Sequence, residues 1–144
     1  MDALELLKQD HARVKKLFDK AESADDREQK RIFSQIKSEL EMHAHIEENI
    51  FYPAMQRYDE LKEMIVESLK EHNNMKTLLQ KMASLSDRED FEDKLEELID
   101  NVEHHAEDEE EGKMFPKVRE LVSVNELQKL GAQLQAAKGQ RKAS

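Results

Sequence analysis

Six histidine and glutamate side chains recur at spacings that suit the binding of metal ions. Two pairs have the form His-x-x-x-Glu, which places both side chains on one face of a helix, one turn apart. Two further histidines stand alone. The six candidate ligands are His11, His43, Glu47, His72, His105 and Glu109. Four imidazoles and two carboxylates that converge on one interior point form a site for two divalent metal ions.

These six residues interrupt four apolar stripes of helical period. The stripes run over residues 4–21, 33–50, 69–82 and 95–109, and each is typical of an amphipathic helix. A glutamate on such a stripe costs several kcal/mol to bury without a partner. No lysine or arginine occupies the stripe positions. A cation bound between the helices is therefore the favoured interpretation, and a metal-free polar core is the alternative.

The chain also repeats itself in two halves. The matched positions are Asp10 with Glu71, His11 with His72, His43 with His105, Glu47 with Glu109, and Tyr52-Pro53 with Phe115-Pro116. The offset between the halves grows from 61 to 62 and then to 63 residues along these pairs. An extra residue inside a helix is most simply absorbed as a π-bulge. We expect that bulge in the fourth helix, near Gly112.

The composition favours long helices over other classes of fold. The chain of 144 residues has 39% charged and 5% aromatic residues, with three glycines and two prolines, which suits neither a sandwich nor a barrel. It contains no cysteine, which excludes disulfide frameworks, thiolate metal sites and thiol nucleophiles. The length suits one domain with a core of its own.

Polar clusters between the stripes predict the topology. Asp87 is suited to cap the fourth helix, and short links make neighbouring helices antiparallel. We therefore expect an all-α, up-down-up-down four-helix bundle with a short fifth C-terminal helix, in a single domain over 1–144. The expected bounds are about 3–122 for the bundle, about 124–138 for the fifth helix and 139–144 for a frayed tail.

Charge and hydropathy limit the partners. The formal net charge is −10, which disfavours nucleic acid because nucleic-acid binders present basic faces. No apolar run approaches the ~18 residues of a membrane span, so we expect no membrane partner. The first residues lack a basic segment followed by an apolar one, which is the pattern of a secretory signal. We expect the protein in the cytoplasm.

Four motifs around the candidate ligands form a specific set. They are Asp10-His11, His43-x-x-x-Glu47-Glu48 ahead of Phe51-Tyr52-Pro53, Glu71-His72, and His105-x-x-x-Glu109-Glu110 ahead of Phe115-Pro116. With them the chain resembles the haemerythrin-like family, also called the HHE cation-binding domain, over roughly residues 3–120. The resemblance implies a four-helix bundle around a non-haem di-iron centre. By the family pattern Glu47 and Glu109 bridge two iron ions with an oxo group, and the four histidines are terminal ligands.

One departure from the family pattern bears on function. The oxygen-carrying haemerythrins have a further histidine one turn after the third-helix ligand, and Lys76 occupies that position here. Two six-coordinate irons need about twelve ligand positions, of which the remaining set fills about ten. Open positions favour reaction with dioxygen, peroxide or nitric oxide over reversible oxygen storage.

Three functions compete at this point. The first is a di-iron protein that binds or reacts with these small oxidants, with weak peroxide-consuming or oxidase activity. The alternative is a non-enzymatic sensor of oxygen or iron, or an iron-binding module, and the third is a plain structural bundle. A sensor usually needs an output domain, for which a chain of this length has no room, and this favours the first.

Four neighbouring residues are weaker candidates. His45 and His104 stand beside the presumed ligands, and we interpret both as lying outside the site. His104 with Asp108 is a rival pair to the fourth-helix ligands, but the repeat offset and the apolar stripe favour His105. Glu48 and Glu110 are interpreted as solvated side chains, as extra ligands, or as acceptors for histidine N–H groups.

Overall fold

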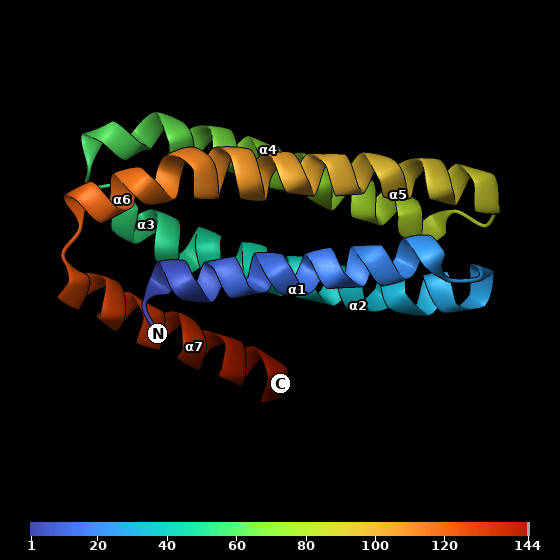
Figure 1. Ribbon diagram of the computed structural model, residues 1–144, viewed down its shortest axis with the longest axis horizontal. Coiled ribbons are helices and arrows are strands. Elements are labelled where there is room, and N and C mark those ends of the chain that lie inside the picture. Colours follow the sequence, from blue (N-terminus) through green and yellow to red (C-terminus); the bar gives the residue numbers. More distant parts are fainter. Residues whose placement is uncertain (144) are drawn as a thin grey trace.

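The computed structural model describes the backbone of residues 1–143 and the side chains of residues 1–140. Within this part every regular element is a helix, and four helical rods run antiparallel to their neighbours (Figure 1). A fifth helix folds back along the bundle beside the N-terminus. The predicted all-α, up-down-up-down four-helix bundle with a fifth C-terminal helix is confirmed.

Two of the four rods contain a π-helical segment. The helical elements are α1 (Ala3–Ser23), α2 (Asp26–Ile46), η1 (Glu47–Phe51), α3 (Tyr52–Met55), η2 (Asp59–Leu61), α4 (Lys62–Ser84), α5 (Arg88–Glu103), η3 (His104–Met114), α6 (Phe115–Leu121) and α7 (Val124–Ala143). The second rod consists of α2, η1 and α3, and the fourth consists of α5, η3 and α6. The elements η1 and η3 are the π-helical segments.

Acidic side chains begin three of the rods. Asp2, Asp25 and Asp87 each accept a hydrogen bond from the backbone N–H three residues later, at 2.9, 2.9 and 3.2 Å. Such caps satisfy one of the free N–H groups at a helix start and are worth ~1 kcal/mol each. The predicted cap at Asp87 is confirmed, and the short links that follow each rod keep neighbouring rods antiparallel.

Both π-segments end two residues before a proline. The N–H of Tyr52 donates to the carbonyl of Glu47, five residues back, and the N–H of Phe115 donates to that of Glu110. Proline lacks an N–H, and in a regular α-helix its ring clashes with the carbonyl four residues back. A wider turn ahead of Pro53 and Pro116 relieves that clash.

The π-bulge predicted for the fourth helix is confirmed, and it is longer than a single bulge. The segment η3 extends over 11 residues and includes Gly112. A Cβ at Gly112 would lie 3.0 Å from the carbonyl oxygen of Glu107, so a glycine suits this close approach. The π-segment in the second rod was not predicted.

The interior is apolar toward both ends of the bundle and polar in its middle. Along α1, Leu7 belongs to one apolar cluster and Val14 to another, while Asp10 and His11 lie between them. Burying a large apolar side chain stabilises the fold by ~1.5–3 kcal/mol. The two clusters therefore hold the rods firmly on either side of the polar layer, whose charged groups need other compensation.

The helix α7 packs against α1, α2 and η1, next to the N-terminus of α1 (Figure 1). Its Leu127, Leu130 and Leu134 are buried in the apolar cluster at that end. A Cβ at Gly131 would overlap the backbone of Met1, so the glycine permits close contact between the two segments.

The helix α7 is longer than the sequence predicted. A helix over about 124–138 and a frayed tail over 139–144 were expected, but the helix continues to Ala143. One glycine costs a helix only ~1 kcal/mol, and no proline follows Gly139. Position 144 lies outside the described residues. Within the described part of the chain, no helix combines the length and the apolar character needed to cross a bilayer.

Candidate metal centre

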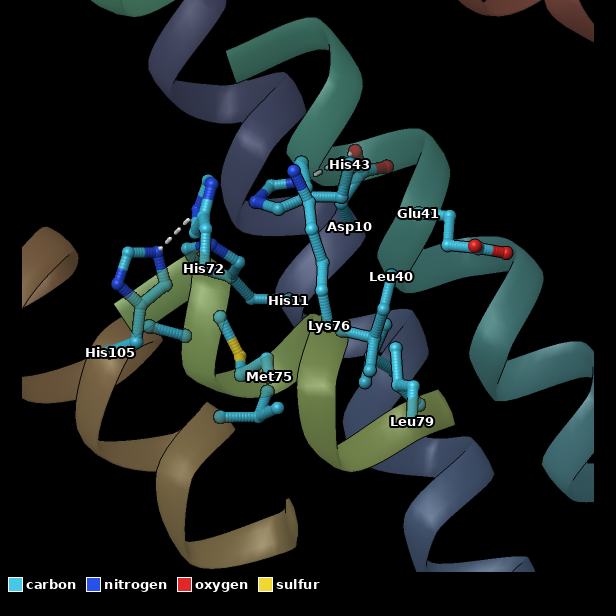
Figure 2. Close-up of a pocket in the computed structure, with 14 residues that line it drawn as sticks. Asp10, His11, Leu40, Glu41, His43, His72, Met75, Lys76, Leu79 and His105 are labelled. Atoms are coloured by element: carbon cyan, nitrogen blue, oxygen red, sulfur yellow. Dashed lines mark hydrogen bonds and ion pairs between the residues drawn. The ribbon is translucent and has the colours of Figure 1, made fainter. Parts of the chain in front are cut away.

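The polar layer gathers imidazole and carboxylate groups from all four rods. His11 comes from α1, His43 from α2 and His72 from α4, while His105 comes from η3. Their rings converge between the two apolar clusters, and Figure 2 shows His72 and His105 facing each other. The Nε2 atoms of these two histidines are 3.2 Å apart. The rods thus bring all four predicted histidines together.

Two overlapping groups of side chains have the geometry of metal sites. One group is formed by His11, His43, Glu47 and Glu110, and the other by Glu47, His72 and His105. Within each group the candidate ligand atoms lie within 4.8 Å of one another. All but His11 are buried, and the His11 side chain is 8% exposed. The two groups share Glu47.

Glu47 contacts imidazoles of both groups. Its Oε1 lies 3.3 Å from Nε2 of His43 and 3.0 Å from Nε2 of His72.

Glu110 occupies the equivalent position on the opposite rod. Its Oε1 lies 3.0 Å from Nε2 of His11 and 3.5 Å from Nε2 of His105. Each of the two carboxylates therefore lies between imidazoles of the two groups.

The structure places Glu109 outside the centre and its neighbour Glu110 inside it. Glu109, expected in the centre, points away from it: its side chain is 20% exposed and pairs with Lys113 at 3.3 Å. Glu110 takes its place, with no exposed surface. The reason is the π-helical turn of η3, in which residues five apart share a face, so His105 aligns with Glu110.

The internal repeat of the sequence indicates that Glu110, and not Glu109, corresponds to Glu47. Glu47 and Glu110 are 63 residues apart, the same offset that relates Tyr52 to Phe115. The offset therefore increases between His105 and Glu110, ahead of the glutamate rather than after it.

Of the four weaker candidates, the two histidines lie outside the centre and the two glutamates lie beside it or within it. His45 is exposed, and the His104 side chain is 56% exposed and lies 3.3 Å from Asp108. Both lie outside the centre, as the sequence interpretation placed them. Glu48 lies beside the centre and contacts His72, and Glu110 lies within it.

Each of the four histidines makes a hydrogen bond to a carboxylate through its Nδ1 atom. The Nδ1–H groups of His11, His43, His72 and His105 donate to Glu111, Asp10, Glu48 and Glu71, at 2.6, 2.9, 2.8 and 2.6 Å. A carboxylate on Nδ1 fixes the ring orientation and leaves Nε2 free to bind a metal.

These outer carboxylates follow the internal repeat as well. Asp10 corresponds to Glu71, and Glu48 corresponds to Glu111. Except for Glu48, the sequence interpretation gave them no role in orienting histidines. An acidic residue directly precedes both His11 and His72, and this recurrence could have indicated the role of Asp10 and Glu71.

A tyrosine distinguishes the two halves of the site. The hydroxyl of Tyr52 donates to Oε2 of Glu110 at 2.6 Å and lies 3.2 Å from Oε1 of Glu47. Burial raises the pKa of Tyr52 well above its ordinary value, and Glu110 and Glu47 raise it further. The phenol therefore stays protonated. Its counterpart Phe115 has no hydroxyl and stacks on His11 instead.

Opposite charges dominate the electrostatics of the metal-free centre. Burial alone would lower the pKa of His43, but Glu47 and Asp10 raise it well above its ordinary value. The same balance, with Glu110 as the main carboxylate, raises the pKa of His105 to about 10. Burial would raise the pKa of Glu47, but His43 lowers it well below its usual range. Without a metal, protonated imidazoles compensate the buried carboxylates.

The residues present suit a transition-metal ion. Two atoms that face the centre, Nε2 of His43 and Oε2 of Glu47, are buried without a hydrogen-bond partner among the described residues. Such groups are costly unless something satisfies them. A set of imidazole and carboxylate donors without thiolates suits iron, zinc and similar cations. A metal ion would satisfy both atoms.

Metal binding at this centre is expected to stabilise the protein more at pH 8 than at pH 6. A metal must displace the protons held on the imidazoles. In the metal-free chain, histidines with raised pKa values stabilise the fold fully below their unfolded pKa of about 6.5. That contribution is lost as the pH rises through the folded pKa, which is about 10 for His105.

The measurement is the melting temperature of cobalt-loaded and metal-free protein across this range. We expect the difference between the two forms to widen toward pH 8. A difference that narrows would contradict this description of the charges.

A small apolar cavity adjoins the histidines. Its volume is about 30 Å³, and all four histidines line it together with apolar side chains that include Leu40, Met75 and Leu79. Figure 2 shows these three below the imidazoles. Lys76 also lines the cavity, and its ammonium pairs with Glu48 at 2.9 Å. The cavity suits a small molecule of low polarity.

Comparisons with known proteins agree with this geometry. A family model described as the hemerythrin HHE cation-binding domain matches residues 2–118. The fold is similar to the crystal structure of a hemerythrin HHE cation-binding domain-containing protein from Mycobacterium kansasii, with a TM-score of 0.85 and 29% identity. That similarity covers 97% of this chain and 86% of the other.

A curated relative is considerably longer. The chain is 28% identical over 143 residues to a DNA nickase from Nostoc sp. (strain PCC 7120). The aligned region is 96% of this chain but 39% of the relative. The chain thus spans about two fifths of the length of that protein.

Proposed function

Since this chain belongs to the hemerythrin HHE cation-binding domain family, we propose that its centre holds two iron ions and reacts with a small oxidant. The observation that carries the proposal is the pair of buried ligand groups that share Glu47. The two groups have only Glu47 in common, and four imidazoles with two carboxylates suit a pair of ions. An oxo group would complete the bridge.

Each protein ligand has a defined part in this proposal. His11 and His43 would hold one ion, and His72 and His105 would hold the other. Glu47 would bridge them, and we propose Glu110 in place of Glu109 as the second bridge, because Glu110 contacts imidazoles of both groups.

When bound, iron supplies Lewis acidity and the electrons that oxygen chemistry requires. The chain's own groups prepare the surroundings. The outer carboxylates hold each imidazole in one tautomer, and the Tyr52 hydroxyl keeps a proton beside Glu110. The apolar side chains of the cavity exclude water, which favours entry of a small neutral molecule.

Dioxygen, peroxide and nitric oxide are the substrates that this arrangement fits. A cavity of about 30 Å³ leaves room for a molecule of two to four atoms. Lys76 supplies no ligand because its ammonium is paired with Glu48. Positions on the ions are thereby left for the substrate, which favours reaction over reversible storage.

We propose no action on DNA for this chain, although a longer relative is called a DNA nickase. The name of the relative refers to the whole protein, and this chain spans only 39% of its length. The net charge of −10 also opposes binding to a polyanion.

The direct test is metal analysis of protein purified from iron-replete cells, followed by assays with oxidants. We expect close to two irons per chain and near-ultraviolet absorption from an oxo-bridged pair. The reduced protein should oxidise rapidly in air, and the oxidised protein should consume added peroxide. Two irons without peroxide consumption would favour the alternative of an oxygen or iron sensor, and only trace metal after reconstitution would contradict the proposal.

A further inference from the structure

A lysine from α7 reaches the polar layer of the bundle. The Lys138 side chain is 8% exposed, and its ammonium pairs with Oδ1 of Asp10, which lies 128 residues earlier in the chain. A lysine that is almost completely buried is uncommon without a charged partner. This contact is therefore the reason that the charge is tolerated at this position.

Asp10 connects this lysine to a candidate ligand. While Oδ1 pairs with Lys138, Oδ2 accepts the hydrogen bond from Nδ1–H of His43 at 2.9 Å. Arg13 also approaches Oδ1 at 3.2 Å, but its side chain is 44% exposed and is screened by water. The buried chain of contacts runs from Lys138 through Asp10 to His43.

The rest of α7 fixes the lysine in place. Leu130 and Leu134 are buried against the bundle, and Gly131 allows the close approach to the backbone of Met1. Lys138 lies one turn beyond Leu134, on the same side of the helix. The family match ends at residue 118, so this helix lies outside the matched domain.

We infer that Lys138 is a positioning residue for the metal centre, by which α7 controls the ion that His11 and His43 hold. The lysine holds the Asp10 carboxylate in place, and Asp10 fixes the ring of His43. The opposite half differs, because Glu71, the counterpart of Asp10, lies 3.5 Å from the more exposed His104. The inference rests on the proposed metal pair, and it predicts that α7 acts on one ion only.

The test is a cobalt(II) titration of the full chain with chelator competition, which resolves two binding steps by affinity and by absorption. We expect Lys138→Met to weaken one step by about tenfold, the lower end of the ~10–100-fold range for a partner that contacts the ligand itself, and to leave the other unchanged. Lys129→Met is the matched control, since Lys129 lies on the exposed face of the same helix. Circular dichroism and the melting temperature of the metal-free variants report whether the fold is retained.

The same substitution in a second variant, Asp10→Asn, distinguishes a positioning role of Lys138 from a merely structural one. In Asp10→Asn protein, Lys138→Met should add little further loss of affinity, because both act through one contact. Lys138→Arg should keep most of the affinity, since it retains a cation on Asp10. An equal loss in both backgrounds, an equal weakening of both steps, or no loss at all would overturn the inference. Failure of the unmodified protein to bind cobalt would instead contradict the proposed metal centre.

Discussion

Glu110→Ala is expected to empty the metal centre, whereas Glu109→Ala leaves it loaded. Glu110 is completely buried and its Oε1 faces imidazoles from both ligand groups. Removing it takes away the proposed second bridge, which is the carboxylate that faces Nε2 of His11 and of His105. We expect the affinity for iron to fall by more than the ~10–100-fold that loss of an outer partner costs. The measurement is iron content and chelator competition after reconstitution.

Glu109→Ala is a matched control from the adjacent position. Its carboxylate pairs with Lys113 at the surface, and such pairs contribute ~0–1 kcal/mol. The variant should bind two irons and melt within a few degrees of the unmodified protein. The reverse result, with Glu109 required and Glu110 dispensable, would mean that the fourth rod is a regular α-helix at this point.

Removal of both metal ions should lower the melting temperature at pH 7 by about 16–32 °C. Each ion at a thousand times its Kd adds about 4 kcal/mol to the free energy of unfolding, and each kcal/mol shifts the melting temperature of a chain of this size by about 2–4 °C. The physical cause is the pair of buried carboxylates, Glu47 and Glu110. Their charges are then balanced only by protons on the imidazoles.

The measurement is calorimetry of the iron-loaded, metal-free and reloaded protein. Reloading should restore the melting temperature, and the Glu110→Ala variant should show little response to added iron. Equal melting temperatures for the loaded and metal-free forms would contradict a structural contribution from the metal.

The sequence predicted most of the arrangement because helical periodicity is a strong signal. The apolar stripes gave the four rods, and each predicted histidine stands where a stripe faces the centre. The prediction of Glu109 at the centre came from counting an α-helical turn across η3, where the structure has a π-helical one. A π-helical turn holds one more residue than an α-helical turn, and no residue type marks it in the sequence. In this chain the signal is the offset of 63 residues between Tyr52 and Phe115.

Other parts of the site depend on contacts that periodicity does not encode. Acidic residues number 33 of 144, so Glu71 and Glu111 do not stand out as partners of histidines on other rods. Lys138 is 128 residues from Asp10, and its role depends on how α7 folds back along the bundle. That packing is decided by Leu130, Leu134 and Gly131 together, at long range.

The position of Tyr52 between Glu47 and Glu110 has a consequence for ancestry and design. Two similar helical hairpins around one centre resemble a two-fold dimer whose protomers have been fused into one polypeptide. A true homodimer carries every residue twice, so a phenol at Tyr52 would impose a second phenol at the position of Phe115. Fusion removes that constraint, since each half can mutate alone. The chain can therefore make its two groups of candidate ligands chemically unequal, which no symmetric assembly of identical hairpins can do.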